Sequence, residues 1–174
     1  MNLEAIPAGK NAPEDINVII EVPRGSSVKY ELDKESGAVF VDRFLFTPMA
    51  YPCDYGFVPN TLADDGDPID VLVVGDAQLA PGVVIRARPV GVLVMEDDGG
   101  KDEKILAVPH SKMTSMYDHI KTHEDLPQIL RDQIKHFFEH YKDLEPGKWV
   151  KIEDWDGPDR AMQMIQASMD NMKK

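Results

Sequence analysis

Three carboxylates, those of Asp65, Asp67 and Asp70, fall within six residues of this 174-residue chain. Like charges this close repel one another, and burial would raise their pKa values unless a positive partner lies among them. A hard divalent cation such as Mg²⁺ best suits a cluster of oxygen ligands. An apolar run at 71–74 follows the cluster and predicts a buried strand. The pattern therefore predicts a metal site on a rigid support.

A helix–loop–helix calcium site is one alternative for this cluster. Such a loop needs glycine at its sixth position and glutamate at its twelfth. Counted from Asp65, these positions hold Asp70 and Asp76, and Pro68 lies inside the loop. The calcium loop is therefore excluded. Pro68 is instead expected to restrict Asp67 to extended backbone and so to fix the direction of its carboxylate.

Composition narrows the function classes. The chain has 31 acidic and 19 basic residues, for a net charge of −12 with neutral histidines. Nucleic-acid binding usually needs a basic face, so this balance argues against it. It also argues against a phosphate site, unless bound cations reverse the local charge. The single cysteine, Cys53, favours a reducing compartment. No signal peptide or membrane span is expected, so the predicted location is cytoplasmic.

Alternating apolar residues predict short strands at 16–22, 28–33, 38–41, 69–74, 83–88, 90–95, 104–108 and 148–153. Apolar stripes at three- and four-residue spacing predict helices at 126–142 and 158–172. Asp125 and Pro127 mark the start of the first helix, and Asp156 is the expected cap of the second. The order predicts a mainly β protein of the α+β class, a small closed barrel with two helices packed outside. No linker interrupts it, so residues 1–174 are expected to form one domain.

Other side chains have both a chemical and an ordinary interpretation. Lys29 and Glu31 lie on the same face of a strand. Such a pair is usually a weak ion pair at the surface. The Arg43 guanidinium could bind a phosphate through two N–H groups, or it could be a surface group at the end of a strand. Tyr51 and Tyr55, in a loop rich in proline and glycine, could donate hydroxyls to an oxyanion or anchor the loop. Cys53 is expected to be a small buried filler rather than a nucleophile.

Taken together, these residues closely resemble the family I soluble inorganic pyrophosphatases in their short bacterial form. The family signature Asp-x-Asp-Pro-x-Asp followed by an apolar run stands at 65–74. Further matches stand at 29–31, 41–43, 51–56, 108–112 and 136–144. The resemblance runs from residue 7 to about residue 155 and is looser around Asp98 and in the last helix.

This resemblance implies a five-stranded barrel like the oligonucleotide-binding (OB) fold, with an acidic cavity. The implied activity is Mg²⁺-dependent hydrolysis of pyrophosphate to two orthophosphates by direct attack of a metal-activated water. The reaction drives pyrophosphate-releasing biosynthetic reactions forward. Several Mg²⁺ ions per site are expected, with Mn²⁺ or Zn²⁺ as substitutes and Ca²⁺ as an inhibitor. The implied assembly is a homohexamer built as a dimer of trimers.

The resemblance also implies a role for each matching residue. Asp67 is the expected base that takes a proton from the attacking water. The tightest metal sites are expected at Asp65, Asp70 and Asp102. Asp97 is expected to bind additional metals, with Glu21 and Glu31 supporting the site. The expected phosphate-contacting groups are Lys29, Arg43, Tyr55, Lys104, Tyr141 and Lys142.

Two alternatives stay open beside this function. One is a nonenzymatic OB barrel, which would need a basic groove with stacking aromatics. The other is a metal-dependent hydrolase of nucleotides or polyphosphate. A separate question concerns His136, His140 and Asp143, whose spacing places them on one helix face. They suit a zinc pair, a solvated surface stripe, or a subunit contact about a two-fold axis.

Overall fold

Five strands close into a ring that forms the body of the protein in the computed structural model, which describes residues 1–173. Strand β1 pairs with β4 on one side and with β6 on the other, so the ring has no open edge. Strands β5 and β8 run parallel, and the other pairs in the ring are antiparallel. The predicted five-stranded closed barrel is confirmed. Its strands are β1 Ile16–Val22, β4 Asp54–Phe57, β5 Asp70–Val73, β6 Val84–Asp97 and β8 Lys104–Pro109.

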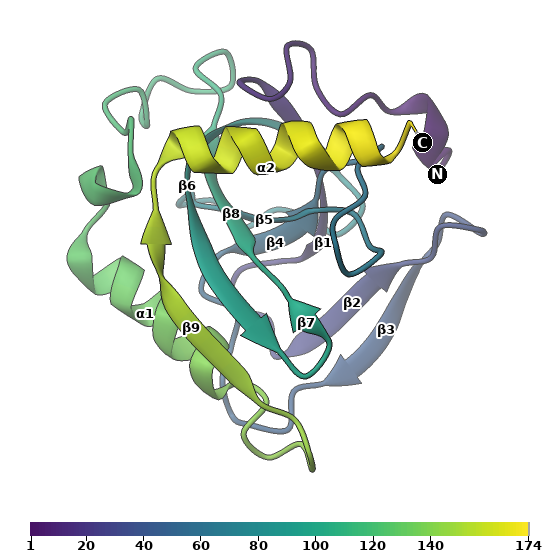
Figure 1. Ribbon diagram of the computed structural model, residues 1–174, viewed down its shortest axis with the longest axis vertical. Helices are drawn as coiled ribbons and strands as arrows, with labels where there is room; N and C mark the ends of the chain where they lie inside the picture. Colours follow the sequence, from purple (N-terminus) through teal and green to yellow (C-terminus); the bar gives the residue numbers. More distant parts are fainter. Residues whose placement is uncertain (174) are drawn as a thin grey trace.

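Four further strands lie outside the ring. Strand β9 (Val150–Asp156) and the short β7 (Gly100–Lys101) both pair with β6. Strands β2 (Val28–Leu32) and β3 (Val39–Phe44) form a separate two-stranded sheet. Figure 1 shows this hairpin projecting to one side of the barrel, with β9 on the other. The expected turn near Gly37 is present, and Gly37 adopts a positive φ of 69° there.

Two helices pack against the outside of the barrel, as predicted. Helix α1 (Gln128–His140) lies beside β9, and α2 (Pro158–Asn171) crosses one end of the barrel against β6 (Figure 1). Each helix buries an apolar face. Ile134, Phe137 and Phe138 of α1 join one core cluster, and Ala161 and Ile165 of α2 join another. Full burial of each large side chain stabilises the fold by about 1.5–3 kcal/mol. Within residues 1–173, neither helix is long and apolar enough to span a membrane.

The structure corrects two strand predictions. The expected strands 83–88 and 90–95 are one strand, β6, because Pro89 is accommodated by a register shift between Pro89 and Gly91 rather than by a break. The expected loop 51–60 contains strand β4, whose four residues are all buried. Gly56 belongs there because an added Cβ would lie 1.9 Å from the Ile19 carbonyl oxygen.

The helices start where predicted, with Pro127 as the N-cap of α1 and Pro158 as the first residue of α2, but the predicted capping residues are wrong. Asp125 belongs to a capping box with Thr122 on a short 3-10 turn, His123–Asp125, that precedes α1. Asp156 does not cap α2, because its carboxylate accepts a hydrogen bond from the amide of Gly157, which is itself the N-cap residue. Ile129 has the spacing of the apolar stripe that predicted this helix, but it is 65% exposed.

Candidate active site

All thirteen predicted site residues line one cavity of about 440 Å³. Barrel strands β1, β4, β5, β6 and β8 supply Glu21, Tyr55, Asp70, Asp97 and Lys104. The β2–β3 hairpin and the end of α1 supply further walls. The connecting segments supply Asp65, Asp67, Asp102, Tyr141 and Lys142. Residues spread over 122 positions of the sequence, from Glu21 to Lys142, therefore meet at one place.

Lys104 lies at the acidic centre of this cavity. The parallel register of β5 and β8 places Asp70 opposite Lys104. The Lys104 ammonium donates to Oδ2 of Asp70 and to Oδ1 of Asp102, each at 2.6 Å. Although burial lowers the pKa of Lys104, the charges of Asp70 and Asp102 raise it well above its usual value. Lys104 is therefore a buried, permanently charged ammonium group.

The loop between β4 and β5 presents the other two carboxylates of the cluster. Oδ1 of Asp65 accepts a hydrogen bond from the Asp67 amide at 3.0 Å, and Gly66 between them has a φ of 90°. The Asp67 side chain is 73% exposed and accepts from the Lys34 ammonium at 2.9 Å. Asp67 thus reaches the open side of the cavity while Asp70 lies deeper.

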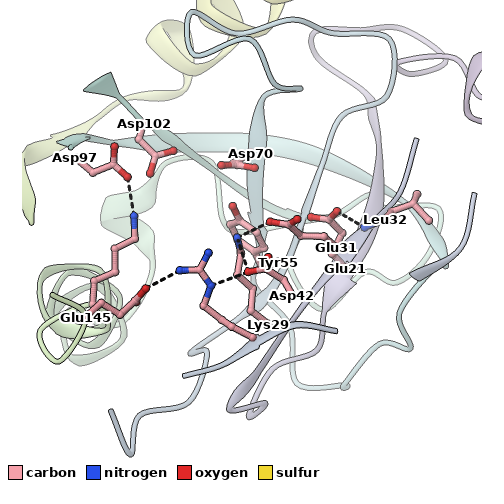
Figure 2. Close-up of polar contacts among 12 residues, drawn as sticks. Glu21, Lys29, Glu31, Leu32, Asp42, Tyr55, Asp70, Asp97, Asp102 and Glu145 are labelled. Atoms are coloured by element: carbon pink, nitrogen blue, oxygen red, sulfur yellow. Dashed lines mark hydrogen bonds and ion pairs between the residues drawn. The ribbon is translucent and has the colours of Figure 1, made fainter. Parts of the chain in front are cut away.

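The β2–β3 hairpin contributes a cationic wall (Figure 2). The Lys29 ammonium lies 2.7 Å from Glu31 Oε1 and 3.6 Å from Asp42 Oδ2. The Arg43 guanidinium donates through Nε to Asp42 at 2.7 Å and through Nη1 to Glu145 at 2.6 Å. The lysine–glutamate pair expected at the surface is therefore part of the cavity lining.

The wall opposite the hairpin repeats this pairing of charges. The Lys142 ammonium lies 2.7 Å from Asp97 Oδ2, and that of Lys148 lies 2.8 Å from Asp98 Oδ2 (Figure 2 shows the first pair). The segment 97–104, interpreted alone as an ordinary exposed acidic hairpin, thus contributes Asp97 and Asp102 to the cavity. Asp98 is not among the lining residues and instead restrains Lys148.

Burial makes several of these carboxylates costly to ionise. It raises the pKa of Glu21 to about 7, although the Leu32 amide donates to this carboxylate at 2.8 Å. Burial also raises the pKa values of Asp65 and Asp102, with the charge of Asp70 adding to the effect. A positive ion among these groups would offset this cost.

The tyrosine hydroxyls remain neutral donors. Burial raises the pKa values of Tyr55 and Tyr51 well above the usual value, and it raises that of Tyr141 as well. Tyr55 is also partly a packing residue, since its ring lies 5.5 Å from that of Tyr51. A protonated hydroxyl at the cavity wall can donate to an anionic oxygen.

The donor set fits divalent cations of the magnesium type. Seven carboxylates line the cavity, namely Glu21, Glu31, Asp65, Asp67, Asp70, Asp97 and Asp102. All-oxygen ligation is what Mg²⁺ prefers. As they stand, no three His, Cys, Asp or Glu side chains in residues 1–173 are placed to hold a metal ion. The reason is visible in the ion pairs, since lysines occupy the oxygens of Asp70, Asp97 and Asp102.

The raised pKa of Glu21 gives a prediction for the cation-free protein. A carboxyl whose folded pKa lies above its unfolded value of about 4.5 lowers stability as pH rises through the interval up to about 7. The penalty reaches at most about 3 kcal/mol above that interval. As pH rises from acid to alkaline, the unfolding free energy of Glu21→Gln should therefore fall less than that of wild type. Urea unfolding with a chelator, at about pH 5 and about pH 8, measures both slopes.

A suitable control is Glu139→Gln, because Glu139 is exposed on α1 and lies outside the cavity. It should keep the wild-type slope. If Glu21→Gln also keeps that slope, the burial of Glu21 does not govern the pH dependence.

Several residues in or beside the cavity were not predicted from the sequence. Lys34, Lys101 and Lys148 line the cavity without belonging to a matching motif, and Asp42 and Glu145 hold Arg43 from either side. Asp42 stood in the matched segment 41–43, which was a usable signal. Nothing in the sequence around Glu145 points to Arg43, which lies 102 residues earlier.

Cys53 and the helix-face histidines lie outside the cavity. Cys53 is 1% exposed and burial raises its pKa to about 12, which confirms its role as a filler. His136 and His140 have ring centres 4.7 Å apart, and His140 Nδ1 lies 2.8 Å from Asp143 Oδ2. The absence of a three-ligand group among the described residues gives no support to the zinc pair.

Comparison with known proteins gives consistent matches. The profile of the inorganic pyrophosphatase family matches residues 18–173. The inorganic pyrophosphatase of Aquifex pyrophilus is 58% identical over 174 residues, covering 100% of this chain and 98% of the relative. That of Escherichia coli (strain K12) is 58% identical and covers 99% of both chains. The crystal structure of the inorganic pyrophosphatase from Thermus thermophilus superimposes with a TM-score of 0.95 at 45% identity, covering 100% of both chains.

Proposed function

The chain belongs to the inorganic pyrophosphatase family, and from this premise we propose that its cavity hydrolyses pyrophosphate to two orthophosphates with Mg²⁺. The observation that carries the proposal is the lining itself, in which seven carboxylates alternate with paired lysines and Arg43. Carboxylates suit hard cations, and lysine and arginine suit phosphate oxygens. One cavity thus has both the metal-binding and the phosphate-binding groups that cation-assisted phosphoryl transfer requires.

The metal-holding residues are proposed from the family resemblance, and all of them line the cavity. Asp65, Asp70 and Asp102 would hold the tightest cations, and Asp97 would hold additional ones. Glu21 and Glu31 support this group from the barrel and the hairpin. The bound cations supply acidification of water and neutralisation of phosphate charge. Mg²⁺ is the proposed ion, with Mn²⁺ or Zn²⁺ as substitutes.

The phosphate-binding groups are the cations and hydroxyls of the lining, namely Lys29, Arg43, Tyr55, Lys104, Tyr141 and Lys142. Each ammonium is held by a carboxylate before substrate arrives, as the Lys142–Asp97 pair shows. Carboxylates that held cations would leave these ammonium groups available to phosphate oxygens. Their charge stabilises the leaving phosphate electrostatically.

Asp67 is the proposed proton acceptor. Its carboxylate is exposed at the open side of the cavity and held only by Lys34, so it can reach an attacking water. The described lining residues include no serine, threonine, cysteine or histidine. The proposed pathway is direct attack by water, with Asp67 taking the proton.

The direct test of this function is phosphate release from pyrophosphate by the purified chain. We expect rapid release with Mg²⁺ and loss of activity with a chelator, restored by adding Mg²⁺ back. Activity that persists at full strength in the chelator would contradict the cation-dependent mechanism.

Ca²⁺ should bind but support little hydrolysis. It is larger than Mg²⁺, accepts looser geometry at longer distances, and acidifies its water less. In the presence of Mg²⁺, added Ca²⁺ should therefore inhibit by competing for the same carboxylates. Initial rates across a Ca²⁺ titration at fixed Mg²⁺ measure this. Full activity with Ca²⁺ alone would be inconsistent with the mechanism.

We also propose that residues 1–174 form one cytoplasmic domain that assembles as a homohexamer of paired trimers, with the histidine face of α1 at a two-fold contact. His140→Asp should then shift the hexamer toward trimer, since it places a carboxylate beside Asp143 and near its copy. Acid should act in the same direction, because protonated histidines would then meet about the two-fold axis, although Asp143 partly compensates.

Sedimentation of wild type and His140→Asp between about pH 8 and about pH 5 tests the contact. Activity should fall less than assembly, because His140 does not line the cavity. An unchanged distribution of species in both proteins would remove the interface assignment and leave the catalytic proposal intact.

A further inference from the structure

The β2–β3 hairpin carries Lys29, Glu31 and Arg43 but forms no sheet hydrogen bonds with the barrel. Its outer side chains are free of the body of the protein, since Phe40 is 55% exposed and Phe44 is 69% exposed. Leu32 packs one end of the hairpin against Ile19 and Phe57 of the barrel, so the position of the rest of this wall depends on side-chain contacts. Figure 1 shows the hairpin at one side of the barrel.

One ion pair joins the hairpin to the opposite wall. Arg43 Nη1 donates to Oε1 of Glu145 at 2.6 Å, and Glu145 lies in the segment that follows α1. The Glu145 side chain is only 8% exposed, whereas that of Arg43 is 36% exposed. A buried carboxylate without a partner is costly, so Glu145 and Arg43 hold each other in place.

Asp42 holds Arg43 differently. It accepts from Nε of Arg43 at 2.7 Å, but it is the neighbouring residue on the same strand and moves with the hairpin. Asp42 can therefore fix the plane of the guanidinium but not its place relative to the other wall. The contact with Glu145 fixes that place, because Glu145 lies outside the hairpin (Figure 2).

The two carboxylates leave the guanidinium able to bind an anion. A guanidinium has five N–H groups, of which Asp42 and Glu145 each occupy one. The remaining three are available to phosphate oxygens in a fork geometry. The pairing also keeps Arg43 charged, because the hydrogen bond to Asp42 and the charges of Asp42 and Glu145 raise its pKa against the effect of burial.

We propose that Glu145 is a positioning residue that holds Arg43, and with it the β2–β3 hairpin, where the guanidinium receives a phosphate group of pyrophosphate. This inference rests on the proposed function. Because Arg43 is held before substrate binds, less conformational freedom is lost on binding. Glu145 itself need not contact the substrate.

Glu145→Gln tests the inference, since glutamine keeps the shape and removes the charge. KM for pyrophosphate should rise about 5- to 30-fold, the effect of weakening one charged hydrogen bond that restrains a binding residue. The turnover number should change by less than about 3-fold, since a contact kept in ground and transition states affects KM. Glu145→Asp, which keeps the charge, should recover part of the loss. Glu139→Gln is the matched control and should behave as wild type.

A double-mutant cycle with Arg43→Gln separates positioning from general destabilisation. Calorimetry with methylenediphosphonate, which has no hydrolysable bridge, should show about 5- to 30-fold weaker binding for Glu145→Gln in the wild-type background. In the Arg43→Gln background, Glu145→Gln should weaken binding of the diphosphonate by less than about 2-fold.

Equal losses in both backgrounds, or an unchanged affinity, would overturn the positioning role of Glu145. If Glu145→Gln does not fold, Glu145→Asp in the same two backgrounds gives the same comparison. A wild-type chain that neither binds the diphosphonate nor hydrolyses pyrophosphate would overturn the proposed function and this inference together. A wild-type chain that does both, with an additive cycle, would overturn the inference alone.

Discussion

Asp67→Asn should lower the turnover of pyrophosphate by about 10²–10⁴-fold, the usual contribution of a general base. Asparagine keeps the shape of the side chain but cannot accept a proton at neutral pH. The fold should be unaffected, because the Asp67 side chain is 73% exposed and its ion pair with Lys34 lies at the surface. Mg²⁺ binding should change little, since the proposed ligands Asp65, Asp70 and Asp102 remain.

The measurement is the turnover number at saturating pyrophosphate and Mg²⁺, with thermal unfolding as a check on the fold. Asp64→Asn is the matched control, because Asp64 lies in the same loop, is exposed, and does not line the cavity. It should retain wild-type turnover. If Asp67→Asn turns over nearly as fast as this control at neutral pH, Asp67 is not the base.

Asp70→Asn should weaken Mg²⁺ binding by about 10- to 100-fold, because it removes a charged ligand from a site that needs charge. Excess Mg²⁺ should restore part of the activity, which distinguishes this variant from Asp67→Asn. The substitution also removes one of the two carboxylates that hold the Lys104 ammonium at 2.6 Å. Some loss of turnover should therefore remain even at saturating Mg²⁺.

Activity measured across a Mg²⁺ titration gives the apparent affinity of each protein. Asp76→Asn is the control, because Asp76 follows strand β5 in the sequence but does not line the cavity. Its activity should depend on Mg²⁺ concentration as that of wild type does. A wild-type Mg²⁺ curve for Asp70→Asn would show that Asp70 is not a ligand.

The residues that line the cavity could be predicted from the sequence because they lie in short local patterns. Asp65, Asp67 and Asp70 stand together before an apolar run, and Lys29 and Glu31 share a strand face. Apolar runs also located most barrel strands, since β1 and β8 are apolar and buried along almost their whole length. Matching all these segments to one family placed them in a common site.

The partners of these residues could not be predicted, because they depend on how distant segments meet. Glu145 contacts Arg43 across 102 residues, and Lys142 contacts Asp97 across 45 residues. Strand β4 was missed for a related reason. Its residues are buried on both faces by the barrel and its neighbours, so the segment shows no alternation, and its glycine resembles a loop signal.

The central claim is that this cavity acts on pyrophosphate with Mg²⁺. The most direct test compares phosphate release from pyrophosphate and from ATP by the same protein, at equal substrate and Mg²⁺ concentrations. A cavity of about 440 Å³ lined by charged groups should favour the small diphosphate, so we expect kcat/KM to be at least about 100-fold higher for pyrophosphate. Comparable release from both substrates would favour a general nucleotide or polyphosphate hydrolase, and no release from pyrophosphate would contradict the account.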